Sequence, residues 1–230
     1  MEKRMFDPRE RGSGLRRRAA RILVATTVAF CAAVIAITFW REDLRYSLPT
    51  PRPADLVQPP PGKVPELPTA LAARLVPRRP TLVHFYRQEC PCSRFQAEQL
   101  HALLREFGAR VTFVAVLEDT SEEEFLEQGF GDADDPAGAR IAVLRDPAGA
   151  IARALGVYST PQAVVLTDAR VLWYRGNYNV SRYCVDRETQ FARIALDALL
   201  RGVPLPPMPE LATVSYGCEL PSVTSQESMR

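Results

Sequence analysis

A run of 19 residues without a charged side chain, residues 22–40, constrains this 230-residue chain more than any other feature. A helix of that length spans roughly 28 Å, which matches the hydrocarbon core of a bilayer. A core helix rarely lacks every charge over such a length, and a cleaved signal peptide has a shorter apolar region followed by small residues. This run instead ends in Phe39, Trp40 and charged residues. It predicts a single, uncleaved transmembrane helix.

The charges on either side of the run predict its orientation. Residues 1–21 contain eight basic and three acidic residues, and such a basic segment stays in the cytoplasm. The rest of the chain, with 21 basic and 24 acidic residues, is then expected outside the cytoplasm, in the periplasm if the cell is Gram-negative. The protein would be anchored in the inner membrane by one helix. The acidic balance of this larger part argues against a nucleic-acid-binding domain.

Proline divides the remaining sequence into three parts. Eight prolines fall between positions 49 and 68, and such a segment favours extended polyproline II over helix or sheet. Residues 41–68 are therefore predicted to be a semi-rigid linker that holds a folded domain away from the membrane. The domain is predicted over residues 69–202. Residues 203–230, again rich in proline, are predicted to be a C-terminal tail.

Within residues 69–202, strand-like and helix-like segments alternate. Two apolar, β-branched stretches predict strands, and residues 93–107 place leucines and a phenylalanine on one helical face. Ser121 and Glu124 form a capping-box pattern that predicts a short helix. The other predicted elements are strands over 81–87, 110–117 and 141–144, a helix over 147–155, a hairpin of 162–167 and 171–174, and a helix over 189–200 capped by Asp186. This order predicts an α/β fold with a mixed central sheet flanked by helices.

The chemistry is predicted at Cys90, Pro91 and Cys92, where a strand ends and a helix begins. The N-terminus of a helix stabilises a thiolate, and the thiolate is the species that attacks a disulfide. Cys90 is therefore a candidate nucleophile for thiol–disulfide exchange, a reaction that needs no cofactor. The alternative is that both cysteines are structural, since exported proteins use disulfides freely.

These residues resemble the thioredoxin-like superfamily, and in particular its membrane-anchored, periplasmic TlpA-type branch. The stretch TLVHFYRQECPCSRF is similar to the family's strand, aromatic pair and cysteine turn, and Pro161 resembles its cis-proline, which faces the active site. An insertion containing DPAG is typical of the TlpA and peroxiredoxin branches. The chain also resembles membrane-anchored bacterial thioredoxin-like proteins with similar CPC, RYC and YGC elements. The resemblance covers about residues 80–202 and implies a thioredoxin-like fold, Pro161 in the binding groove, and protein thiols or disulfides as partners.

The chain departs from the family at the cysteine turn. The family's resolving cysteine follows the first by three positions, where this chain has Ser93, and Cys92 stands one position earlier. A Cys-x-Cys disulfide closes a small, strained ring and is easily reduced. His84 aligns with a buried acid of many thioredoxins, so it is a candidate proton relay, the alternative being a structural histidine. Arg87 stands where peroxiredoxins have threonine, which argues against a peroxidase.

Two further cysteines, Cys184 and Cys218, extend the candidate site. On this fold the loop with Cys184 is expected on the same rim as Cys90, whereas Cys218 lies in the tail. Four exported cysteines allow three pairings, and the sequence does not choose among them. The favoured arrangement is a structural Cys184–Cys218 disulfide beside a redox pair of Cys90 and Cys92. In the other arrangement, Cys184 or Cys218 resolves Cys90.

Three functions are compatible with these residues. The first, which we favour, is a membrane-anchored, extracytoplasmic thiol–disulfide oxidoreductase that acts through Cys90. The second is a copper-binding or copper-delivery module, because the thiolates of Cys90 and Cys92 would suit Cu(I). The third is a non-catalytic thioredoxin-like scaffold in which every cysteine is structural.

Overall fold

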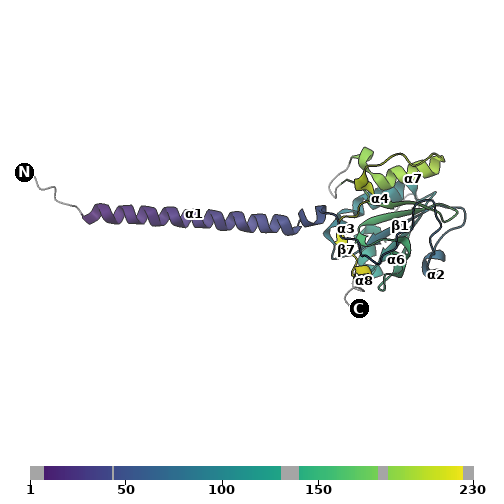
Figure 1. Ribbon diagram of the computed structural model, residues 1–230, viewed down its shortest axis with the longest axis horizontal. Helices are drawn as coiled ribbons and strands as arrows, with labels where there is room; N and C mark the ends of the chain where they lie inside the picture. The colour runs from purple at the N-terminus through teal and green to yellow at the C-terminus, as the bar shows by residue number, and fades with distance from the viewer. Residues whose placement is uncertain (1–7, 43, 131–139, 181–185, 225–230) are drawn as a thin grey trace, which may run out of the picture. The chain divides into compact units, whose positions relative to one another are not determined.

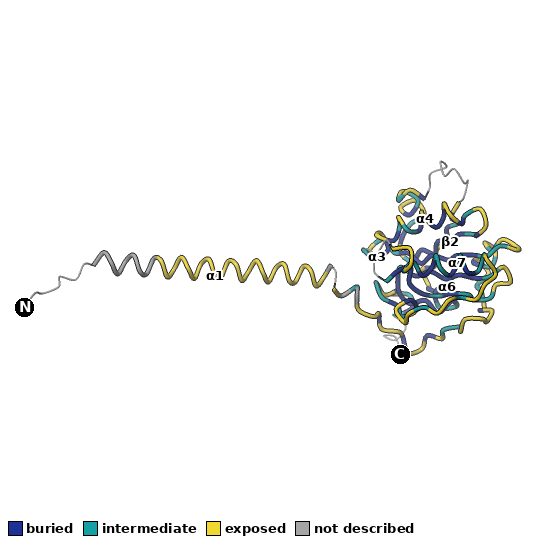
Figure 2. Tube along the Cα trace, turned by 90° about the horizontal axis from the view of Figure 1, so that it is seen from above, coloured by how far each residue is buried: buried dark blue, intermediate teal, exposed yellow. Residues whose placement is uncertain are grey.

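The computed structural model describes residues 8–42, 44–130, 140–180 and 186–224. The chain divides into two compact units, Met1–Arg45 and Tyr46–Arg230. The first contains helix α1 (Pro8–Glu42), in which residues 17–41 are all exposed (Figure 2). Its stretch Arg17–Arg41 is long and apolar enough to cross a bilayer. Length and composition thus agree with the transmembrane helix predicted from the sequence.

The second unit is built on a five-stranded sheet with the order β3-β2-β1-β5-β6. Its strands are β1 (Thr81–Tyr86), β2 (Thr112–Leu117), β3 (Ile141–Arg145), β5 (Gln162–Leu166) and β6 (Leu172–Gly176). The first three are parallel, whereas β5 runs antiparallel to β1, and β6 runs antiparallel to β5. This mixed sheet with flanking helices is a thioredoxin-like fold, as the sequence predicts (Figure 1).

Side chains alternate between the two faces of the sheet, and each face has its own apolar core. On one face, Leu82 and its neighbours pack beneath α4 (Ala97–Phe107) and α7 (Phe191–Arg201). On the other face, Val83 and its neighbours pack with α6 (Ala150–Leu155). α6 has six residues, about 9 Å of helix, so it covers only part of that face.

The remaining helices are short. They are α2 (Thr69–Ala72), α3 (Pro91–Phe95), α5 (Glu122–Phe125) and α8 (Pro221–Thr224), with single turns at Leu44–Ser47, Leu126–Phe130, Arg187–Thr189 and Glu210–Ala212. The capping box predicted at Ser121 and Glu124 is confirmed at the start of α5.

Besides the helix predicted from residue 147, which begins at Ala150, two helix starts differ from the sequence prediction. The predicted helix over residues 93–107 is divided at Gln96, because the Gln96 N–H is shared between the carbonyls of Cys92 and Ser93. Asp186 caps the turn that precedes α7 and not α7 itself. Both differences are local and leave the predicted order of elements unchanged.

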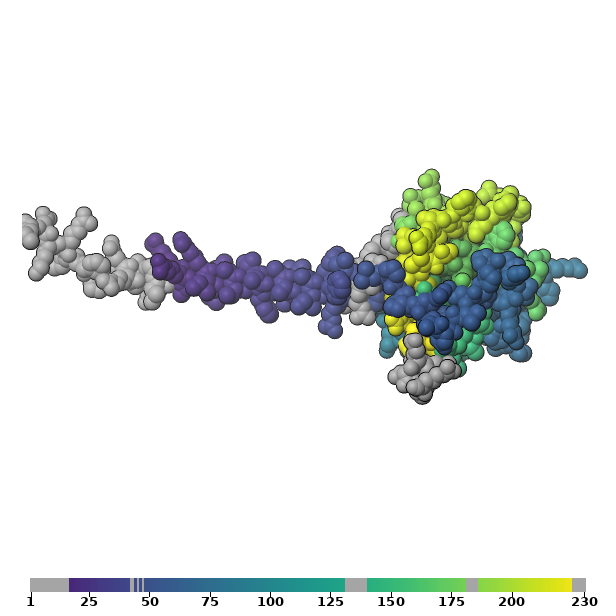
Figure 3. Space-filling model, in the orientation of Figure 1, coloured from purple at the N-terminus to yellow at the C-terminus, as the bar shows by residue number. Residues whose placement is uncertain are grey.

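From residue 46 on, the proline-rich segment predicted to be a spacer belongs to the same compact unit as the domain and lies against it (Figure 3). The side chain of Leu56 is 6 % exposed and belongs to the same core as α6. The Gly62 N–H donates to the carbonyl of Leu172, and the Leu172 N–H donates to the carbonyl of Lys63, each at 2.8 Å. The prediction was wrong because the sheet face that α6 leaves open needs an apolar cover, and this segment provides part of it.

The C-terminal tail also belongs to the folded unit. Its strand β7 (Cys218–Glu219) pairs antiparallel with β4 (Ser159–Thr160), a two-residue strand just before β5. Upstream of β7, the Asn177 N–H donates to the carbonyl of Ala212 (2.9 Å). Downstream, Val223 of α8 lies in the second core. The tail therefore reaches the end of the sheet where β1 meets α3.

Candidate active site

Cys90 lies at the start of α3, four residues after the end of β1. Its backbone is extended (φ −86°, ψ 112°), and Pro91 occupies the first helical position, where its missing N–H costs nothing. The carbonyl of Cys90 accepts a hydrogen bond from the Ser93 N–H (3.1 Å). The side chain of Cys90 is 1 % exposed. The predicted strand, turn and cysteine at a helix N-terminus are thus all present.

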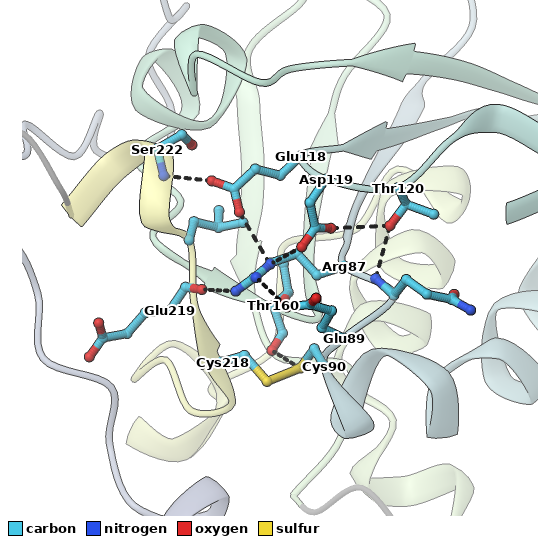
Figure 4. Close-up of polar contacts among 12 residues, drawn as sticks. Arg87, Glu89, Cys90, Glu118, Asp119, Thr120, Thr160, Cys218, Glu219 and Ser222 are labelled. Carbon is cyan, nitrogen blue, oxygen red and sulfur yellow. Dashed lines mark hydrogen bonds and ion pairs between the residues drawn. A yellow bond between two sulfur atoms is a disulfide. The ribbon is translucent and has the colours of Figure 1, made fainter. Parts of the chain in front are cut away.

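The structure joins Cys90 to Cys218 in a disulfide, with 5.8 Å between the two Cα atoms (Figure 4). Strand β7 brings Cys218 to this place, because its pairing with β4 sets Cys218 opposite Thr160. The Sγ of Cys90 lies 3.4 Å from the carbonyl oxygen of Thr160. A disulfide sulfur carries no proton, so this contact can become a hydrogen bond only when Cys90 is a thiol.

The tail approaches β4 very closely beside a cis-proline. The Thr160–Pro161 peptide bond is cis, as the family resemblance implies. Gly217 has a φ of +123°, and a Cβ atom at this position would lie 2.2 Å from the carbonyl oxygen of Thr160. A residue with a side chain could not take this place without moving the backbone. Beyond the cysteine, the Leu220 N–H donates to the carbonyl of Tyr158 (3.0 Å).

The cysteine pairing favoured from the sequence is wrong. Cys218 is bonded to Cys90, and not to Cys184, so the observed pairing is one that the sequence ranked second. Cys92 lies outside this disulfide, with a side chain that is 3 % exposed. A Cys90–Cys92 bond would close a small ring across a helix start, whereas β7 places Cys218 at an ordinary Cα distance for a disulfide. Cys184 lies outside the described residues.

His84 lies in the middle of β1 and is fully buried, with 1 % exposed. Its Nδ1 shares a hydrogen bond with the hydroxyl of Tyr178 (2.7 Å), and the rings of Tyr86 and Phe125 lie close to it. Burial lowers the pKa of His84 to about 3 and raises the pKa of Tyr178 well above its usual range. The imidazole is therefore neutral and the phenol protonated near pH 7.

Sequence reasoning missed the charged residues beside the disulfide. The Arg87 Nε donates to Asp119 (2.8 Å), and its Nη1 donates to the carbonyl of Glu219, the residue after the tail cysteine (3.0 Å). Arg87 follows β1 and Glu118 follows β2, and these parallel strands end side by side. That parallel pairing was the available signal, because it brings the residues after the two strands to one edge of the sheet.

The described residues contain no group of three or more His, Cys, Asp or Glu side chains placed to hold a metal ion. The copper hypothesis requires the thiolates of both Cys90 and Cys92. In the structure the sulfur of Cys90 is bonded to Cys218, so the two cysteines of the CPC motif are not a pair of thiols.

Comparison with known proteins identifies a family and a fold. Residues 65–219 match a domain of unknown function, DUF6436, and no curated protein matches the sequence significantly. A hypothetical protein from Sinorhizobium meliloti 1021 has 24 % identity and a TM-score of 0.53, over 71 % of this chain and 94 % of that chain. An uncharacterized conserved protein from Geobacillus kaustophilus has 23 % identity and a TM-score of 0.52, over 75 % and 96 %. At these identities the likeness bears on the fold alone.

Proposed function

The chain belongs to the DUF6436 family, and we propose that it acts as a membrane-anchored thiol–disulfide oxidoreductase whose exchanging disulfide is Cys90–Cys218. The observation that carries this proposal is the place of the disulfide. It joins the residue just before the first helical residue of α3 to a tail strand that pairs with β4, immediately before the cis-proline, Pro161. A helix start favours the thiolate that attacks disulfides, and the tail supplies a second thiol to complete the exchange.

The proposed cycle begins with Cys90 and Cys218 as thiols. The Cys90 thiolate attacks one sulfur of a partner protein's disulfide, and the partner's other sulfur leaves as a thiolate with the electron pair of the broken bond. The Cys218 thiolate then attacks the Sγ of Cys90, which releases the partner's second sulfur and restores Cys90–Cys218. The partner is reduced by two electrons and the chain is oxidised. The reverse sequence oxidises a partner dithiol, and the two reduction potentials set the direction.

Of the other predicted site residues, only Pro161 has a part in this proposal. Pro161 would shape the groove that receives a partner's chain when β7 moves away from β4. Cys92 and Cys184 are not needed for the cycle. His84 is given no step in the cycle, because burial lowers its pKa to about 3 and so disfavours the imidazolium that a proton relay would form.

We further propose that α1 anchors the protein in the inner membrane, with the domain outside the cytoplasm. The apolar length of α1 and the eight basic residues before position 22 support this orientation. A disulfide in the domain also suits an oxidising compartment. Protease added to spheroplasts should degrade the domain, and protection of the domain would reverse the orientation.

The exchange reaction is tested with the full-length protein in detergent and insulin as the disulfide substrate. With dithiothreitol as reductant, Cys90→Ser should abolish catalysed insulin reduction, because the proposed cycle begins with a mixed disulfide on Cys90. When reduced Cys218→Ser is freed of dithiothreitol and mixed with insulin, a Cys90–insulin mixed disulfide should accumulate, visible by mass spectrometry, because the resolving thiol is gone. Cys31→Ser, in α1, is the matched control and should behave as the wild type.

Two results would contradict the proposal. Activity that persists in Cys90→Ser would move the chemistry elsewhere. If the Cys90–Cys218 disulfide resists mild reduction in the folded protein, the bond is structural. The scaffold hypothesis would then replace the oxidoreductase.

A further inference from the structure

The segment that follows Cys218 is held at two backbone atoms by charged side chains (Figure 4). The Arg87 Nη1 donates to the carbonyl of Glu219 (3.0 Å), and the Ser222 N–H donates to Oε1 of Glu118 (2.6 Å). Both contacts are made to the backbone, so they act on the position of the tail whatever its side chains are. They lie one and four residues beyond the cysteine that bonds to Cys90.

Arg87 and Glu118 also form a pair with each other. The Arg87 Nε lies 3.3 Å from Oε2 of Glu118, while its N–H is directed at Asp119, 2.8 Å away. The side chains of Arg87 and Glu118 are 15 % and 9 % exposed, so water and salt screen this pair less than an ordinary surface pair. Because β1 and β2 end in register at Tyr86 and Leu117, the sheet itself sets the two charges side by side.

We propose that Arg87 and Glu118 are positioning residues that hold the tail on β4 and so keep Cys218 beside Cys90 when both are thiols. This inference rests on the proposed exchange reaction. The two cysteines are 128 residues apart, and in an undocked tail the cost of bringing them together would oppose the bond. Docking removes most of that cost and raises the effective concentration of one thiol at the other. The pair therefore sets how readily the disulfide forms.

The equilibrium with glutathione measures this effect directly. Two chain thiols and one glutathione disulfide give the Cys90–Cys218 bond and two glutathione molecules, which takes two electrons and two protons from the chain. The full-length protein in detergent is equilibrated over a range of glutathione ratios, quenched by alkylation, and the disulfide-linked peptide pair is quantified by mass spectrometry. The fraction of linked peptide pair depends on how well the tail is docked. A general loss of stability at a distant site does not change that fraction.

Arg87→Gln should lower the equilibrium constant for disulfide formation about tenfold, because a charge-assisted hydrogen bond to the tail is lost. That change is a rise of about 30 mV in the two-electron reduction potential. Arg87→Lys keeps the charge and should recover part of the effect, and Glu118→Ala should shift the constant in the same direction as Arg87→Gln. Arg193→Gln is the matched control, since the Arg193 side chain is 17 % exposed and pairs with Glu106 away from the tail. It should leave the constant unchanged.

The outcomes separate the inference from the function on which it rests. If glutathione equilibrates with Cys90–Cys218 but Arg87→Gln and Glu118→Ala match the wild type, the positioning role is wrong and the oxidoreductase stands. An equal shift in Arg193→Gln would also refute the positioning role. If the disulfide does not exchange with glutathione in any variant, the oxidoreductase fails and the inference fails with it.

Discussion

Gly217→Ala is the substitution that most directly tests whether close contact between the tail and β4 makes the disulfide. A Cβ atom at position 217 would lie 2.2 Å from the carbonyl oxygen of Thr160 and 3.1 Å from its carbonyl carbon. Carbon and oxygen atoms of neighbouring strands are normally about 3.3 Å or more apart, so the tail must withdraw by about 1 Å. The atoms that would have to yield are backbone atoms and not the end of a flexible side chain.

The size of the effect follows from this geometry. A non-glycine residue held at a φ of +123° costs on the order of 1–3 kcal/mol, and the overlap with Thr160 adds to that cost. In an undocked tail the alanine is unstrained. The docked, disulfide-bonded state should therefore be destabilised by about 3 kcal/mol relative to the dithiol with an undocked tail. The equilibrium constant for disulfide formation should fall by about a hundredfold. The corresponding rise in reduction potential is about 60 mV.

The assay is the glutathione equilibrium of the full-length protein, with quantification of the Cys90–Cys218 peptide pair. Gly202→Ala is the control, because Gly202 also has a positive φ (+67°) but a Cβ there meets nothing within 4 Å. It lies at the end of α7 and should lower the free energy of unfolding by about 1 kcal/mol without changing the disulfide equilibrium. A Gly217→Ala protein that forms the disulfide as readily as the wild type would refute the argument from close approach.

Two further predictions concern the buried groups around the site. Cys92→Ala should leave the glutathione equilibrium of Cys90–Cys218 unchanged, because Cys92 lies outside that bond; a large shift would return a resolving role to Cys92. Burial lowers the pKa of His84 from 6.5 to about 3. As the pH falls, the unfolded chain therefore protonates this histidine before the folded chain does. The contribution of neutral His84 to the free energy of unfolding is complete above about pH 6.5 and is lost progressively toward pH 3. Urea unfolding at several pH values should show this slope, and His84→Phe should reduce it; an unchanged slope would contradict the assignment to His84.

The sheet was predictable from the sequence because its strands carry their own signal. Residues 81–86 and 112–117 are mostly apolar on both faces. Strands that are buried on both faces have such nearly continuous apolar runs, which can be recognised without knowing the neighbouring strands. The position of Cys90 at a helix start was predictable for the same local reason. The cis bond before Pro161 came from the family resemblance and not from the local sequence.

The errors concern segments whose structure depends on distant partners. Proline content favoured a free spacer, but the apolar side chain of Leu56 and the backbone of residues 62–63 find partners on the sheet and on β6. The disulfide pairing depends on the contact of Gly217 with Thr160, 57 positions apart, and on a guanidinium from the end of β1. Neither contact has a periodicity or a spacing that sequence reasoning could detect.

The anchoring of the tail limits the movement that exchange requires. Upstream of Cys218, the Thr50 N–H donates to the carbonyl of Ser215 (2.8 Å), which ties the tail to the proline-rich segment. Downstream, Leu220 and Val223 are buried in the core that also contains α6. Releasing the whole tail would expose these apolar side chains to water, whereas releasing residues 216–219 would not. In the dithiol form, the docked tail should therefore open only transiently, over a short segment between two fixed points. Such an opening admits a partner's chain to β4 and keeps the resolving thiol within reach.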